Sequence, residues 1–123
     1  MARILIVDDE RAVRVTMRRI LERDGHEVCE AGDGEAALEQ FRALLPDLVL
    51  MDLYMPKVDG VEATIRLQTE FPGAQVIGMS GGGWRSKEAV LEEVAGLGIA
   101  DTLPKPFTMD EVLDVVSRVL AAA

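Results

Sequence analysis

The sequence predicts an α/β fold: a doubly wound, five-stranded parallel sheet with five helices distributed over its two faces. Two features of its 123 residues lead to this fold class. Short apolar runs of strand length alternate strictly with segments in which apolar residues recur at helical spacing. Runs that are apolar throughout, such as residues 48–51, are typical of strands buried on both faces, as in parallel sheets. The chain length fits a single domain.

The first two predicted strands flank a helix. Residues 4–7 form an apolar run, and residues 10–24 carry apolar side chains at the spacing of one helix face. Gly25 is a typical stop after a helix. A short strand is therefore expected directly afterwards, at residues 26–30.

The second helix begins after Asp33, whose side chain can accept hydrogen bonds from the free amides of the first turn. Its apolar stripe consists of Ala37, Leu38, Phe41 and Leu45. Pro46 closes the helix, because the residue before a proline is disfavoured in helical conformation. The third strand is then expected immediately after this proline.

The remaining elements continue the same alternation. In order, they are a strand at 48–51, a helix at 61–71, a strand at 75–79, a helix at 86–97, a short strand at 101–103 and a helix from 109 to the chain end. Residues 59–62 have capping-box spacing, with Asp59 in place of the usual Ser or Thr, and Thr108 with Glu111 forms a full capping box. Five strands alternating with five helices imply a parallel sheet covered on both faces.

Composition narrows the classes of function. The net charge is −9, from 22 acidic and 13 basic residues, which disfavours direct nucleic-acid binding and suits partners with basic patches. Cys29 is the single cysteine, so an intrachain disulfide is excluded, and we expect it to be a small core residue. The N-terminus does not resemble a signal peptide, and no apolar run approaches the roughly 18 residues of a membrane span. We therefore expect a cytoplasmic protein without membrane contact.

Four of the predicted strands end in polar residues. Asp8 and Asp9 follow the first strand, Asp52 the third, Ser80 the fourth and Lys105 the fifth. Because parallel strands end at the same edge of a sheet, where open α/β sheets bind ligands, these side chains are expected to meet in one crevice. Each alone could be a helix cap, a turn residue or a solvated loop residue. Their joint position at four strand ends is not explained in that way.

Three clustered carboxylates repel one another and require a cation, and oxygen ligands with open positions for water suit Mg²⁺. A carboxylate can also act as a nucleophile on a phosphoryl group and form an aspartyl phosphate. An ammonium group and a hydroxyl would stabilise the negative phosphoryl oxygens. The residues therefore predict phosphoryl transfer to Asp52, with Asp8 and Asp9 at the metal and Ser80 and Lys105 at the phosphoryl group.

At this point the sequence also resembles a known family. The motifs are Val7-Asp8-Asp9-Glu10, Met51-Asp52-Leu53-Tyr54-Met55-Pro56 with Asp59-Gly60, then Ser80, and Lys105-Pro106-Phe107. They resemble the receiver domain of two-component response regulators, in the same order and at similar intervals. The resemblance implies the flavodoxin-like strand order 2-1-3-4-5 and one receiver domain over residues 1–123. Because the sequence ends after the last predicted helix, we expect a stand-alone receiver without an output domain in this chain.

The resemblance also implies roles at the metal. Asp9, Asp52 and the backbone carbonyl of Tyr54 would bind Mg²⁺ directly, and Asp8 would act mostly through water. Asp52 would be the phosphoacceptor, with a histidine kinase or a phosphotransfer protein as donor. The chain would then be a phosphorylation-controlled switch for binding a downstream protein, which assists its own phosphorylation and dephosphorylation, rather than an enzyme in the usual sense.

On the phosphoryl side, the resemblance assigns Ser80 and Lys105 to the phosphoryl oxygens and implies a cis peptide bond between Lys105 and Pro106. Family members usually carry an aromatic residue three positions before the lysine, which turns inward on activation. Here that position is Thr102, which places aromatic switching in doubt. Trp84 lies in the loop after the fourth strand, either packed against the next helix or contacting a partner. We expect Ser80, Thr102 and Trp84 to be the switch residues.

Three other functions remain as alternatives. Mg²⁺-dependent phosphohydrolases with an aspartate nucleophile typically have a second aspartate two residues later, where this chain has Tyr54. A flavin- or nucleotide-binding protein would need a first loop that accepts phosphate, and Asp8-Asp9-Glu10 would repel it. A pure interaction module that is not phosphorylated is the third alternative, and a Mg²⁺ titration would distinguish it from an active receiver.

Overall fold

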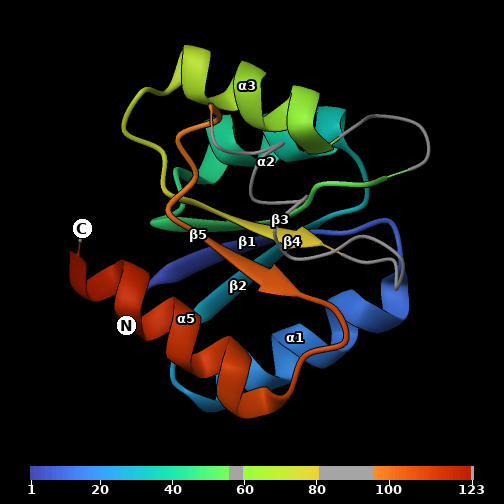
Figure 1. The fold of residues 1–123 in the computed structure, drawn as a ribbon, viewed down its shortest axis with the longest axis vertical. Helices are drawn as coiled ribbons and strands as arrows, with labels where there is room; N and C mark the ends of the chain where they lie inside the picture. The colour runs from blue at the N-terminus through green and yellow to red at the C-terminus, as the bar shows by residue number, and fades with distance from the viewer. Residues whose placement is uncertain (56–59, 81–95, 123) are drawn as a thin grey trace.

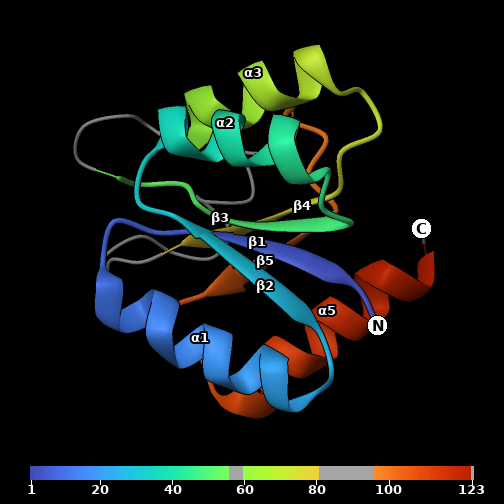
Figure 2. The same cartoon turned by 180° about the vertical axis from the view of Figure 1, so that it is seen from behind.

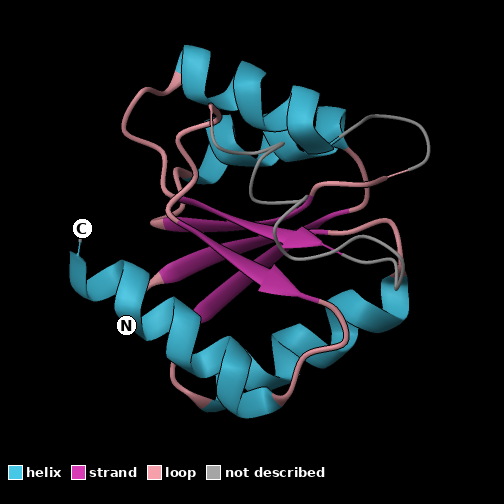
Figure 3. Ribbon diagram, in the orientation of Figure 1, coloured by secondary structure: helices cyan, strands magenta, loops and turns pink. Residues whose placement is uncertain are grey.

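The computed structural model describes residues 1–55, 60–80 and 96–122. The strands in these ranges are β1 (Arg3–Val7), β2 (Glu27–Ala31), β3 (Leu48–Asp52), β4 (Val76–Ser80) and β5 (Asp101–Pro104). They form one parallel sheet in the order β2-β1-β3-β4-β5, which confirms the predicted fold class and strand order. Figure 3 shows the strands as a single central layer between helices.

The helices in the described ranges are α1 (Arg11–Arg23), α2 (Gly34–Leu44), α3 (Gly60–Glu70) and α5 (Met109–Ala122). α1 and α5 cover one face of the sheet, and α2 and α3 cover the other, as both views show (Figures 1 and 2). The helix predicted at 86–97 falls mostly outside the described residues. None of the described helices has the length and apolar character needed to cross a membrane.

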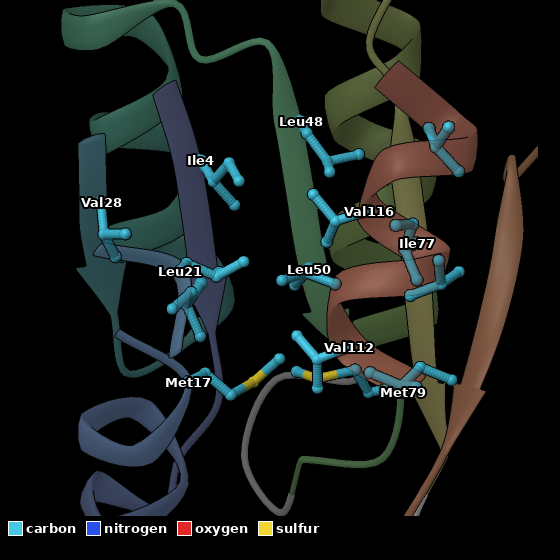
Figure 4. Close-up of a cluster of buried hydrophobic side chains, with 14 residues drawn as sticks. Ile4, Met17, Leu21, Val28, Leu48, Leu50, Ile77, Met79, Val112 and Val116 are labelled. Carbon is cyan, nitrogen blue, oxygen red and sulfur yellow. The ribbon is translucent and has the colours of Figure 1, made fainter. Parts of the chain in front are cut away.

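Successive residues of the strands pack into two separate cores, because side chains alternate between the faces of a sheet. Ile4 and Ile6 contribute to the core under α1 and α5, whereas Leu5 and Val7 contribute to the core under α2 and α3. Figure 4 shows the first core, where Met17 of α1 and Val112 and Val116 of α5 approach the central strands. All five residues of β3 are buried, since β3 is central and covered on both faces. This burial explains the uninterrupted apolar run.

Two predicted helix caps are confirmed. The side chain of Asp33 accepts a hydrogen bond from the amide of Ala36 at 2.8 Å. Thr108 and Glu111 cap α5 reciprocally: the Thr108 amide donates to Glu111 Oε1 at 2.8 Å, and the Glu111 amide donates to Thr108 Oγ1 at 3.1 Å. The cap expected at Asp59 lies outside the described residues.

Some predicted boundaries were wrong. β2 begins at Glu27 rather than His26, because the His26 amide donates to the carbonyl of Leu21 and so belongs to the turn that ends α1. Leu45 is not part of the apolar stripe of α2: it has a left-handed backbone (φ 45°) and is 64% exposed. Cys29 is only half-buried, although it packs beside the core under α2 and α3.

Candidate functional site

The polar residues at the strand ends lie together because the strands are in register at this edge. Val7 pairs with Met51 in the ladder between β1 and β3, so the next residues lie side by side: Asp8 directly after β1, and Asp52 as the last residue of β3. On the other side, β4 and β5 are joined in the same way beyond their last pair. There the Lys105 amide donates to the Ser80 carbonyl at 2.6 Å.

Asp8 is fully buried and is held at every polar atom. Its amide donates to the carbonyl of Ala31 at 3.2 Å, and its carbonyl accepts from Arg14 Nη1 at 2.7 Å. Of its carboxylate oxygens, Oδ1 accepts from the Glu10 amide at 2.9 Å and Oδ2 accepts from Lys105 Nζ at 2.6 Å. Two contacts therefore orient the carboxylate, and two more hold the peptide groups on either side of it.

Asp52 lies beside it and is 4% exposed. Its Oδ1 accepts from the Tyr54 amide at 3.1 Å, and its Oδ2 lies 3.5 Å from Lys105 Nζ. Burial, assisted by the nearby charge of Asp8, raises the pKa of Asp52, and the Tyr54 and Lys105 contacts offset only part of this rise. Among the described residues, the hydrogen bonds and the positive charge near Asp52 therefore offset only part of the free energy that its ionised carboxylate loses when it is removed from water.

Lys105 bridges the two carboxylates. Burial alone would lower the pKa of its ammonium group, but the hydrogen bond to Asp8 and the charges of Asp52 and Asp8 outweigh it and raise the pKa. The side chain is 16% exposed and stays charged at neutral pH. The peptide bond between Lys105 and Pro106 is cis, which confirms the prediction.

A group of carboxylates that could hold a metal ion lies at the same edge. Ligand oxygens of Asp8, Asp9 and Glu10 all lie within 4.8 Å of one another, with Asp8 buried and the other two exposed. Oxygen donors that are open to water on one side fit Mg²⁺. Asp52, which we predicted as a ligand, is not part of this group, and Glu10, which we did not predict, is.

Residues 4–117 match the sequence profile of the response regulator receiver domain. The chain belongs to this family. It is the signalling-switch module of two-component systems rather than an enzyme in the usual sense.

The receiver domain has relatives of two sizes. It is 39% identical over 121 residues to Protein CcdB of Bacillus subtilis, covering 98% of both chains. It is 40% identical over 113 residues to the response regulator MprA of Mycolicibacterium vanbaalenii, but it spans only 47% of that protein, about half of its length. Among solved structures, the receiver domain of NtrX from Brucella abortus superposes with a TM-score of 0.89 at 30% identity, covering 98% of this chain and 99% of the other.

The structure describes some of the predicted switch residues and not others. Ser80 ends β4 and is half-buried, and Thr102 is half-buried in β5, where it pairs with Gly78. Tyr54 is also half-buried, two residues after Asp52. Trp84 lies outside the described residues, so its predicted part in the switch stays a prediction.

Two residues of the receiver's site were missed at the level of sequence. A Cβ atom added to Gly60, the first residue of α3, would lie 1.8 Å from the carbonyl oxygen of Asp52, so only glycine fits there. The signal was present as the Asp59-Gly60 motif, but its capping-box spacing indicated the start of a helix rather than a close approach to Asp52. Arg14, which donates to the Asp8 carbonyl, gave no signal, since it lies on a helix rich in arginine.

Proposed function

We propose that this receiver domain is a phosphoacceptor switch in which Asp52 takes a phosphoryl group from a histidine kinase or a phosphotransfer protein. The supporting observation is the buried Asp52 carboxylate beside the Lys105 ammonium, at the strand edge that also carries the acidic group. In the transfer, an Asp52 oxygen bonds to phosphorus while the phosphorus–nitrogen bond of phosphohistidine breaks. The imidazole keeps that electron pair as the leaving group.

Asp8, Asp9, Asp52 and the backbone carbonyl of Tyr54 would hold Mg²⁺, with the Glu10 carboxylate nearby. When bound, the metal would neutralise the carboxylates and the oxygens of the transferring group. Because Asp9 and Glu10 are exposed, water has access to the remaining coordination positions. The buried Asp8 contributes a carboxylate whose orientation is already fixed.

Lys105 would respond to phosphorylation by changing partners. In the unmodified domain it donates to Asp8 at 2.6 Å, and its distance to Asp52 is 3.5 Å. A phosphoryl group on Asp52 offers this ammonium new anionic acceptors, and the Ser80 hydroxyl is the second donor. Since Thr102 has no ring to turn inward, the signal would pass through the loop after Ser80 to Trp84.

We further propose that residues 1–123 act as one receiver domain. Support comes from the single sheet and from the two cores that join all described elements. Phosphorylation would then change the affinity for a downstream protein. The acidic surface, with a net charge of −9, suits a partner with a basic patch rather than nucleic acid.

Intact mass after incubation with a small phosphodonor and Mg²⁺ tests the central step. Wild type should gain one phosphoryl group that is labile to base, and Asp52→Asn should gain none. Asp114→Asn is the matched control, because Asp114 is a strongly exposed aspartate of α5 paired with Arg118. Equal labelling of wild type and Asp52→Asn would exclude Asp52 as the acceptor.

A Mg²⁺ titration by calorimetry separates this function from that of an interaction module without phosphorylation. An active receiver should bind Mg²⁺, and Asp9→Ala should weaken the binding. A wild-type domain that releases no heat with Mg²⁺ and takes no phosphoryl group would support the interaction module instead.

A further inference from the structure

Two arginines of α1, one helical turn apart, make parallel sets of contacts. Arg14 donates from Nε to Glu30 Oε1 at 3.0 Å and from Nη1 to the carbonyl of Asp8 at 2.7 Å. Arg18 donates from Nε to Glu30 Oε2 at 2.7 Å and from Nη2 to the carbonyl of Val28 at 3.2 Å. Both share the carboxylate of Glu30 on β2. They differ in the backbone carbonyl that they hold, and Arg18 also contacts Glu22 Oε2 at 3.4 Å.

The carbonyl held by Arg14 is the one that precedes the exposed acidic residues. Asp8 follows the last residue of β1, where the regular ladder of the sheet ends. Because the peptide group is planar, fixing the Asp8 carbonyl also fixes the plane from which Asp9 departs. The Asp8 amide is already tied to Ala31 on the other side. Arg14 therefore restrains the direction in which the Asp9 side chain leaves the sheet.

Glu30 determines which groups the guanidinium of Arg14 contacts. A guanidinium close to Asp9 and Glu10 has these carboxylates as alternative partners, and such a pair would compete with a metal ion. Instead, one edge of Arg14 is engaged by Glu30, with side-chain exposures of 18% and 26%, and Nη1 is directed to a neutral carbonyl. The two exposed carboxylates are thereby left available for a cation.

We propose that Arg14, held by Glu30, is a positioning residue that orients the Asp8–Asp9 peptide for Mg²⁺ binding. This rests on the proposed function, in which Asp8 and Asp9 hold the metal. Residues that orient metal ligands through hydrogen bonds typically contribute about 10- to 100-fold to metal affinity. For a site partly open to water, the lower end of that range is expected.

Arg14→Gln and Arg18→Gln form a matched pair for the test. Both remove one positive charge, one bond to Glu30 and one bond to a backbone carbonyl. Arg18→Gln additionally removes the 3.4 Å contact with Glu22, and only Arg14→Gln releases the Asp8 carbonyl. Calorimetric titration with Mg²⁺ alone should give about tenfold weaker binding for Arg14→Gln and near wild-type binding for Arg18→Gln. A simple charge effect has the opposite sign, because removing a cation near the site should tighten the binding of another cation.

Arg14→Lys provides a second measurement. A lysine keeps the charge but lacks the fork needed to engage Glu30 and the Asp8 carbonyl together, so Mg²⁺ affinity should stay below that of wild type. Melting temperatures without metal show that each variant is folded. Unchanged or tighter Mg²⁺ binding in both Arg14 variants, or an equal loss in Arg14→Gln and Arg18→Gln, would overturn the positioning role. Failure of the wild type to bind Mg²⁺ would instead overturn the proposed function.

Discussion

Replacing Gly60 with alanine should disturb the end of β3, which carries Asp52, through a clash with its backbone. The added Cβ would lie 1.8 Å from the Asp52 carbonyl oxygen, and 2.7 Å from both the Asp52 carbonyl carbon and the Leu53 Cα. All three are backbone atoms, so no side-chain rotation can relieve the overlap. The start of α3 and the end of β3 must move apart.

The expected cost follows from this geometry. Overpacking a buried site typically costs about 1–3 kcal/mol, and overlap with backbone belongs at the upper end of that range. Alanine restricts the unfolded chain relative to glycine, which offsets about 0.4–1 kcal/mol. The free energy of unfolding should therefore fall by about 2 kcal/mol, a large part of the roughly 5–15 kcal/mol that is usual for a domain.

Urea denaturation of Gly60→Ala beside Gly73→Ala measures this effect. A Cβ on Gly73 would meet no atom within 4 Å, and the backbone of Gly73 is not left-handed, so that control should be unchanged or slightly stabilised. Gly60→Ala should also accept a phosphoryl group more slowly, because the Asp52 carboxylate is displaced. Equal stability of the two variants would refute the close approach.

Three further predictions concern the charged site and the switch. The folded-state pKa of Asp52 is raised, so the folded domain binds the Asp52 proton more tightly than the unfolded chain does. This proton therefore stabilises the fold below the unfolded pKa of about 3.9, and the stabilisation is lost as pH rises through the folded pKa. Asp52→Asn in metal-free buffer should therefore be more stable than wild type at pH 7, with a gap that closes near pH 4 in urea denaturation; a gap independent of pH would contradict this. Lys105→Ala should destabilise the metal-free domain by about 3 kcal/mol, because the substitution leaves a buried carboxylate without its counterion. The phosphorylated form of this variant should bind the downstream partner no better than its unmodified form does. Wild-type partner affinity of that phosphorylated variant would show that the lysine does not carry the signal. A phosphoryl mimic with Mg²⁺ should change the fluorescence of Trp84, the single tryptophan, and Ser80→Ala should suppress most of the change; an unchanged spectrum with the mimic bound would exclude the loop as the switch.

The sequence predicted those parts of the fold that depend on local pattern. The apolar run before Asp52 indicated a strand buried on both faces, and β3 is the central strand. The capping box at Thr108 likewise needs only residues close in sequence. Where neighbours in space decide, prediction was less accurate. His26 belongs to the turn after α1 because its amide donates to the carbonyl of Leu21. The conformational preference of histidine does not indicate this turn.

In the candidate site, too, the features that follow from local sequence pattern were predicted, and those that depend on neighbours in space were not. Four strand ends were correctly expected to meet, since parallel strands end at one edge of a sheet. Which charged groups pair there depends on distances between atoms in the folded chain, and the spacing of residues in the sequence does not determine these distances. Lys105 contacts Asp8 more closely than Asp52, at 2.6 Å against 3.5 Å. Arg14 reaches the carbonyl of Asp8 only because α1 folds back along β1 and β2.

The central position of β3 limits how the domain can respond to a chemical change at Asp52. This strand is hydrogen-bonded to β1 on one side and to β4 on the other, and its five residues are buried. Shifting it would disrupt two ladders and both cores at once. β5 has one neighbour, four residues and only one buried residue, so it is the least restrained strand of the sheet. A modification at the centre would therefore leave β3 stationary and displace the β5 edge, which gives the response a direction across the sheet.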